Sequence, residues 1–129
     1  MIVVDSSGWV EFFTDGPLSE QYAVRLRNTA AIVTPTIVLY EVYKRLKRDL
    51  SEEDAVIAAG AMQRTRVVPL DQELALSAAD ISLAQRLAMA DAIVLATARA
   101  FRAELVTSDD DFEGIADVTY LPKPSTSTS

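Results

Sequence analysis

Carboxylates stand at places in this chain where their neighbours are suited to burial. Asp5 directly follows the apolar run Ile-Val-Val, and Asp91 lies near the start of residues 89–101, MADAIVLATARAF, which are otherwise almost entirely apolar. Taking even a merely polar group out of water costs about 2–7 kcal/mol unless a partner compensates it. Carboxylates that converge also repel one another, so some take up protons unless a cation is present. The chemistry that these residues predict is the binding of a hard cation by carboxylate oxygens.

The chain has no cysteine and no histidine, which removes several classes of site. A Ser-His-Asp triad, histidine acid–base catalysis, imidazole-held zinc, disulfides and thiolate metal sites are all excluded. The expected counter-charge for an all-oxygen cluster is then Mg²⁺ or Mn²⁺. The net charge of −7 argues against a general nucleic-acid binder, but it allows a nucleic-acid enzyme whose site is itself acidic.

Another acid, Glu41, lies on the helix predicted for residues 35–50, at the border of its apolar stripe. Lys44, Arg45 and Arg48 follow on the same flank of this helix, within a sector of roughly 100°. Three cations beside an acid suit a phosphate backbone that is led towards an acidic site. The buried stripe itself is predicted to consist of Val38, Leu39, Val42, Tyr43, Leu46 and Leu50.

Each acid also has a purely structural interpretation. Asp5 could cap the following helix, Asp91 could be a favourable first-turn acid, and residues 109–111, Asp-Asp-Asp, could form a turn. Glu41 and Arg45 could be a solvated i,i+4 ion pair. Singly, each structural interpretation is the more economical one. Together, acids at two strand ends, on a helix flank and at the head of a buried helix favour one shared site.

The predicted elements give the acids a common location. Short β-branched runs alternate with longer helical patterns, which indicates a single α/β domain with a central, mostly parallel sheet of about five strands and helices on both faces. In such sheets the functional crevice lies beyond the carboxyl ends of the strands. The strands are predicted at residues 1–5, 30–34, 66–70, 104–109 and 117–121, and the helices at residues 6–13, 18–29, 35–50, 51–65, 71–87 and 89–101.

The limits of the domain follow from local signals. Thr34 as N-cap and Pro35 at the first helical position predict where the helix at residues 35–50 begins. The domain is predicted to span residues 1–121, and the tail at residues 122–129, PKPSTSTS, to be disordered because it has no apolar residue to bury. No basic leader is seen, and no run approaches the roughly 18 apolar residues of a membrane span, so a cytoplasmic protein without membrane contact is expected.

Four segments together resemble the acidic motifs of PIN-domain ribonucleases. Their order and spacing are most similar to those of the VapC-type toxins of bacterial and archaeal toxin–antitoxin pairs, and the resemblance covers residues 2–121. Each motif alone is weak, but four in order on an α/β chain of this size are fairly specific. The segments are VVDSS, LYEVYKR, MADAIVLATA and LVTSDDDF.

The resemblance implies a PIN-like domain that hydrolyses RNA with a water activated by Mg²⁺ or Mn²⁺. It also implies a homodimer and a cognate antitoxin protein that covers the acidic cleft. Within TSDDDF the family pattern most often matches Asp109, with Asp111 as the less certain candidate. Ser7 and Thr107 are expected to orient the carboxylates or water, and Lys44, Arg45 and Arg48 to bind the RNA. The catalytic and metal-binding acids that the resemblance implies are Asp5, Glu41, Asp91 and Asp109.

Two other functions compete with that of a nuclease. A phosphatase of the haloacid dehalogenase type also has Asp after its first strand, but it needs a second Asp two residues on, where this chain has Ser7. A catalytically silent PIN-like module that binds RNA or protein is the alternative from another class. Intact acids in all four motifs argue against it, because a silent module has no reason to tolerate their repulsion.

Overall fold

A computed structural model of the protein describes residues 1–124. Its centre is a five-stranded sheet in the order β3-β2-β1-β4-β5, and all four strand pairings are parallel, which confirms the predicted α/β class. Because the strands are parallel, their carboxyl ends all meet at one edge of the sheet. The strands are β1 (Ile2–Val4), β2 (Ile32–Pro35), β3 (Arg66–Val68), β4 (Glu104–Thr107) and β5 (Val118–Tyr120).

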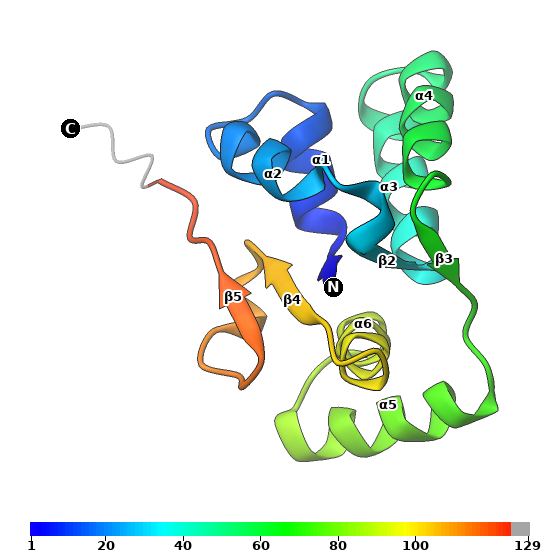
Figure 1. The fold of residues 1–129 in the computed structure, drawn as a ribbon, viewed down its shortest axis with the longest axis vertical. Helices are drawn as coiled ribbons and strands as arrows, with labels where there is room; N and C mark the ends of the chain where they lie inside the picture. Colours follow the sequence, from blue (N-terminus) through cyan, green and yellow to red (C-terminus); the bar gives the residue numbers. More distant parts are fainter. Residues whose placement is uncertain (125–129) are drawn as a thin grey trace.

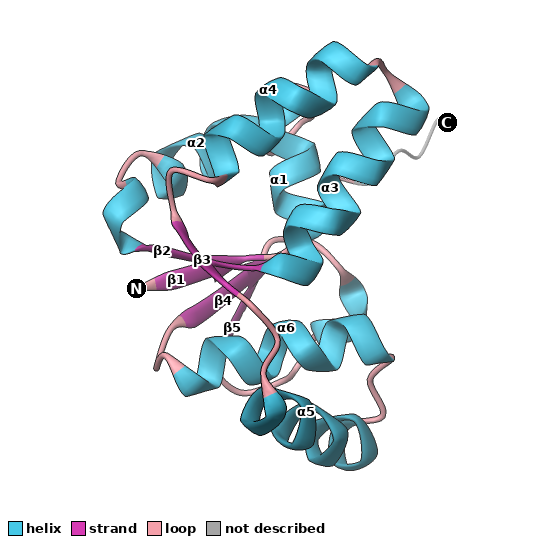
Figure 2. Cartoon of the chain, turned by 90° about the vertical axis from the view of Figure 1, so that its right-hand side faces the viewer, coloured by secondary structure: helices cyan, strands magenta, loops and turns pink. Residues whose placement is uncertain are grey.

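Helices cover both faces of the sheet, as predicted. Four helices lie on one face, and two lie on the other, where α5 packs on the outer side of α6 (Figures 1 and 2). The first group is α1 (Ser6–Phe13), α2 (Ser19–Leu26), α3 (Thr36–Asp49) and α4 (Glu52–Met62). The second group is α5 (Gln72–Gln85) and α6 (Met89–Ala100).

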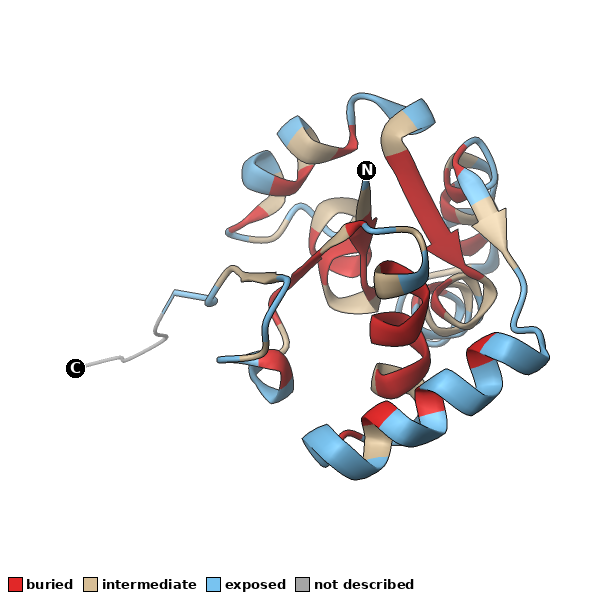
Figure 3. Cartoon of the chain, turned by 60° about the horizontal axis from the view of Figure 1, so that its bottom comes forward, coloured by how far each residue is buried: buried red, intermediate tan, exposed pale blue. Residues whose placement is uncertain are grey.

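The core lies on both sides of the central strands. Val3, Val4, Leu105 and Val106 in β1 and β4 are almost fully buried, because helices cover these strands from above and below. Every residue of α6 from 92 to 98 is also buried, while most of α5 is exposed (Figure 3). The strands next to α6 therefore pack against a buried segment of this helix.

The start of α3 differs from the sequence prediction. Thr34 is not an N-cap but belongs to β2, and its buried hydroxyl lies 2.6 Å from the hydroxyl of Thr65. Pro35 pairs in register with Val68 and is itself the N-cap, so α3 begins at Thr36. Pairing of β2 with β3 extends the strand past the point where local capping rules end it. Leu50, predicted to be buried, is 53% exposed.

The C-terminal tail is described only in part. Residues 122–124 form no regular secondary structure and are exposed, and residues 125–129 of the predicted disordered tail lie outside the described residues. Within residues 1–124 no single helix has both the length and the hydropathy to cross a membrane, although α5 and α6 pass that test as a pair bent by 114°.

Gly8 allows α1 to approach α2 closely, and its replacement tests this packing. A methyl group at Gly8 would overlap the ring of Tyr22 and lie 2.6 Å from Cγ1 of Val4, and both neighbours are fully buried. We expect Gly8→Ala to lower the free energy of unfolding by about 1–3 kcal/mol, as overpacking does. The measurement is urea denaturation.

Gly60 provides the matched control, because a methyl group at this exposed position of α4 meets no atom within 4 Å. Gly60→Ala should therefore raise stability by about 0.5–1 kcal/mol through reduced backbone freedom. Equal effects of the two substitutions would show that α1 and α2 do not pack as described.

Candidate active site

Asp5 occupies the junction of β1, α1 and β4, with 3% of its surface exposed. Its Oδ1 accepts hydrogen bonds from the Ser7 hydroxyl at 2.7 Å and from the backbone N–H of Gly8 at 3.3 Å, and its Oδ2 accepts one from the Thr107 hydroxyl at 2.7 Å. Asp5 therefore does cap α1, but it also faces the neighbouring strand. Burial raises its pKa to about 6, against the opposing effect of these hydrogen bonds.

The segment after β4 turns sharply and carries three consecutive acids, Asp109, Asp110 and Asp111. The N–H of Asp109 donates to the Thr107 hydroxyl at 2.9 Å, and the Asp109 carboxylate accepts from the N–H of Asp111 at 2.9 Å. Asp109 thereby caps the 3₁₀ turn Asp110–Phe112, whose Phe112 side chain is fully buried. The structural interpretation of this run as a turn is correct, and the turn fixes where its acids lie.

Asp91, in the first turn of α6, meets these acids. One carboxylate oxygen each from Asp91, Asp109 and Asp111 lies within 4.8 Å of the other two. The pKa of Asp91 rises to about 7, first because of burial and then because of the charges of the surrounding acids. The structure brings both candidates of the Asp-Asp-Asp run next to Asp91, so it does not favour Asp109 over Asp111.

Glu41 approaches the same edge from α3 but lies outside this group of three. Burial raises its pKa, a hydrogen bond with Ser6 opposes this rise, and the charge of Asp109 adds to it. Glu41 and Asp5 also contribute to the raised pKa of Asp91, so the charges of four acids act on Asp91. The proposed pair between Glu41 and Arg45 is not formed, because the guanidinium of Arg45 lies 3.9 Å from Asp49 instead.

The three cations predicted on the flank of α3 do lie together beside Glu41. Lys44, Arg45 and Arg48 line a cleft of about 250 Å³ together with Glu41. Arg48 donates a hydrogen bond to Asp49 at 2.7 Å, and this pairing partly neutralises the positive charge of Arg48. A larger hollow of about 610 Å³, between α5 and α6, contains none of the predicted site residues.

No basic side chain within residues 1–124 lies in ion-pair distance of the five acids; the ion pairs there involve other carboxylates. The negative charge at the sheet edge must then be met by protons or by a bound cation. The donors are all carboxylate oxygens, which Mg²⁺ and Mn²⁺ prefer. Ligands at about 2.1 Å from one ion are at most about 4.2 Å apart, so small side-chain rotations would bring the cluster of Asp91, Asp109 and Asp111 around an ion. The residues therefore fit a divalent metal.

The sequence did not reveal three hydroxyl groups that support this site. The hydroxyl of Tyr22, on α2, lies 2.6 Å from the hydroxyl of Ser108, and both residues are buried. The N–H of Ser108 donates to the Ser7 hydroxyl at 3.0 Å, which links Tyr22 to Asp5. Ser6 contacts Glu41 as described above. Helical periodicity predicts that Tyr22 is buried, but not that its hydroxyl reaches a residue 86 positions away.

Asp91→Asn should gain stability relative to wild type as the pH rises from about 4 to about 7 in metal-free protein. In the unfolded chain Asp91 ionises near its ordinary pKa of 3.8, whereas in the folded protein it ionises near 7. Wild type therefore loses unfolding free energy across this window, while Asn keeps the shape and has no charge to gain. Thermal melts in EDTA at several pH values give the difference between the two proteins.

Asp80→Asn is the control, since Asp80 is exposed on α5. Its melting temperature should differ from that of wild type by the same small amount at every pH. If the difference between Asp91→Asn and wild type were equally independent of pH, Asp91 would not be crowded by other acids.

Comparisons with known proteins agree with this arrangement. The family model of the PIN domain matches residues 2–118. A chain of a toxin–antitoxin complex from Klebsiella pneumoniae is similar in fold, with 24% identity, a TM-score of 0.78, and coverage of 92% of this chain and 96% of that one. VapC20 of Mycobacterium tuberculosis, a toxin that cleaves the sarcin-ricin loop, has 23% identity, a TM-score of 0.72 and coverage of 90% and 95%. No curated protein matches the chain in sequence. Since the family model spans most of its length, the chain belongs to the PIN domain family.

Proposed function

We propose that this protein is a divalent-metal-dependent endoribonuclease of the VapC toxin type. The observation that carries the proposal is the meeting of Asp91, Asp109 and Asp111 at the carboxyl edge of the sheet, with Asp5 and Glu41 beside them and no protein cation paired with any of them in residues 1–124. Membership of the PIN family and the likeness to an RNA-cleaving toxin support the choice of RNA.

The side chains of this site have separate tasks in the proposed reaction. A divalent cation, when bound, would supply an activated water and would stabilise the charge on the phosphodiester. Asp91, Asp109 and Asp111 would hold it, with Asp5 and Glu41 completing the acidic edge. Asp91 would release its proton when the cation binds, because its pKa of about 7 is set by burial and by its acidic neighbours.

The hydrogen bonds around Asp5 would keep the acids in place between turnovers. Thr107 donates to Asp5 and accepts from the N–H of Asp109, so one hydroxyl fixes two acids from different strands. Ser7 performs the same task towards Asp5 and Ser108. These contacts support the orienting role that was predicted for Ser7 and Thr107, because a fixed ligand geometry favours one metal position.

Lys44 and Arg45 would bind backbone phosphates next to the acids. Arg48 would contribute less, because it donates two hydrogen bonds to Asp49 at 2.7 and 3.0 Å, whereas Arg45 lies 3.9 Å from that residue. We also propose that the protein acts as a homodimer and is inhibited by a cognate antitoxin. Similar folds occur in a toxin–antitoxin complex of Klebsiella pneumoniae and in a VapBC complex of Salmonella typhimurium bound to DNA, with 20% identity in the latter. An arginine or lysine of the antitoxin would suit the acidic cluster.

The proposal is tested by RNA cleavage with controlled metal. Purified protein should cleave single-stranded RNA with Mg²⁺ or Mn²⁺, lose all activity in EDTA, and show little turnover with Ca²⁺, whose looser coordination misplaces the water. Asp91→Asn should reduce cleavage to background, while Asp80→Asn on the outer face of α5 should leave it unchanged. The readout is gel separation of a labelled RNA.

Thermal melts give a second measurement that does not depend on activity. Wild type should gain about 2.7 kcal/mol at a metal concentration of 100 times the dissociation constant, and Asp91→Asn should gain much less. RNA cleavage that continues in EDTA would refute the metal mechanism. A metal-induced gain in stability without any cleavage would favour the silent binding module instead.

A further inference from the structure

We propose that a second cleft, on the β5 side of the acids, binds a nucleotide of single-stranded RNA adjacent to the bond that is cut. This inference rests on the proposed function and extends the RNA path beyond α3. The cleft measures about 450 Å³, and Tyr120 and Lys123 line it together with Arg45 and Asp109. Neither Tyr120 nor Lys123 was among the residues that the sequence singled out.

The two clefts lie next to each other at the acidic edge. Ser6 and Arg45 line both the cleft beside α3 and the cleft beside β5, so they form a shared wall. Asp109, a member of the acidic cluster, lines the second cleft. A strand that follows both clefts therefore passes the acids in its middle, as a substrate of an endonuclease must.

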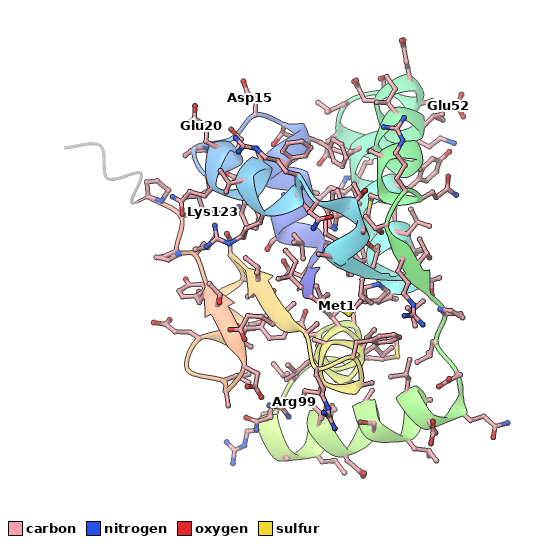
Figure 4. All side chains as sticks on the ribbon, in the orientation of Figure 1. Met1, Asp15, Glu20, Glu52, Arg99 and Lys123 are labelled. Atoms are coloured by element: carbon pink, nitrogen blue, oxygen red, sulfur yellow. The ribbon has the colours of Figure 1, made fainter. Side chains whose placement is uncertain are left out.

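Lys123 is positioned at this cleft by an ion pair with a buried acid, Glu11. Its Nζ lies 3.9 Å from Oε2 of Glu11, whose side chain is only 8% exposed, and Oε1 of Glu11 accepts from the N–H of Leu18 at 3.0 Å. The side chain of Lys123 remains 53% exposed, so its ammonium can also bind a phosphate. Figure 4 shows Lys123 just beyond the carboxyl ends of β4 and β5, beside α2.

Tyr120 is held by backbone pairing to β4, the strand that directly precedes Asp109 and Asp111. It is the last residue of β5 and pairs in register with Thr107, and the next residue, Leu121, donates its N–H to the carbonyl of Thr107 at 2.7 Å. The half-buried ring therefore belongs to a residue paired with Thr107, and Asp109 follows Thr107 by two residues, just after the end of β4. Proteins that bind single-stranded nucleic acids commonly combine an aromatic ring with cations along a groove. The unstacked bases of a single strand can stack on the ring.

The charges of the cleft favour RNA over an acidic protein segment or a duplex. Arg45 and Lys123 offer two cations, and Asp109 would be neutralised by the proposed divalent ion, which leaves Asp110 as the opposing acid. A duplex keeps its bases stacked within the helix, so Tyr120 could not reach them. A phosphate beside Lys123 with its base on Tyr120 uses both features.

The test measures binding of a fluorescent single-stranded oligoribonucleotide of mixed sequence by anisotropy, with otherwise wild-type protein in Ca²⁺, which is expected to bind the acids but to support little turnover. Tyr120→Leu should weaken binding about fivefold or more, while Tyr120→Phe, which keeps the ring, should bind like the parent. Lys123→Ala should reduce the slope of log affinity against log salt by about 0.7, the value for one phosphate of a single strand. Tyr120→Leu should not change the binding of a duplex of the same sequence, because the bases of a duplex stay stacked within the helix.

Lys47→Ala is the matched control. Lys47 is similarly exposed at 49% and also pairs with a glutamate, Glu52 at 3.2 Å, but it lines neither cleft. Its salt slope should equal that of the parent. Lys123→Ala changes an exposed side chain, so it remains informative even if Tyr120→Leu disturbs β5.

The outcomes separate this inference from the proposed function. If wild type cleaves RNA while Tyr120→Leu and Lys123→Ala bind it as Lys47→Ala does, the inference is overturned and the nuclease proposal stands. If binding of RNA is unchanged but these two substitutions weaken binding of an antitoxin, the cleft belongs to the protein partner and the inference is again overturned. If wild type neither binds nor cleaves RNA with Mg²⁺ or Mn²⁺, both proposals fail.

Discussion

The carboxylate of Asp5 is buried where β1, α1 and β4 meet, and each of its oxygens accepts a hydrogen bond from a hydroxyl on a different element. Ser7 anchors it to the first turn of α1, and Thr107 anchors it to the end of β4. Hydrogen bonds to a carboxylate favour its charged form and partly offset the cost of burying it. A non-accepting side chain here would remove the carboxylate acceptor of both hydroxyls, one of which, that of Thr107, is fully buried and costly to leave unsatisfied. The same acid therefore joins the central strands and begins the acidic edge.

The rest of the edge is unfavourable by itself, and the surrounding packing makes it possible. Burial first, and then the charges of four other acids, raise the pKa of Asp91 to about 7, so the metal-free site is strained at neutral pH. Two supports hold it in place: the buried run of α6 that follows Asp91, and Phe112, whose buried ring anchors the turn that carries Asp109 and Asp111. Apolar burial far from any charge thus holds together groups that repel one another, and a divalent ion would relieve that repulsion.

Local patterns in the sequence predict much of this site because strand ends and helix starts are local features. Asp91 could be placed at a helix head by apolar periodicity alone. Local patterns fail where distant residues decide. The hydroxyl of Thr34 pairs with that of Thr65, and β2 pairs with β3, so Thr34 became part of a strand although capping rules assign it to a helix. The support that Tyr22 gives Ser108 depends on a contact 86 residues apart. That both Asp109 and Asp111 reach Asp91 depends on the geometry of the turn after β4, which three equal residues do not encode.

The net charge of −7 raises the question of how such a chain would bind a polyanion. At physiological ionic strength charges more than about 8 Å apart are largely screened, so acids on the outer faces of α4 and α5 contribute little at the sheet edge. What matters there is the local balance, in which Lys44, Arg45 and Lys123 stand on the two sides of the acidic cluster. An ion bound to the cluster would convert its centre from repulsive to attractive for phosphate. Net charge therefore argues against indiscriminate binding along the whole surface, whereas the proposed function would need only a local, metal-dependent path for RNA beside the acids.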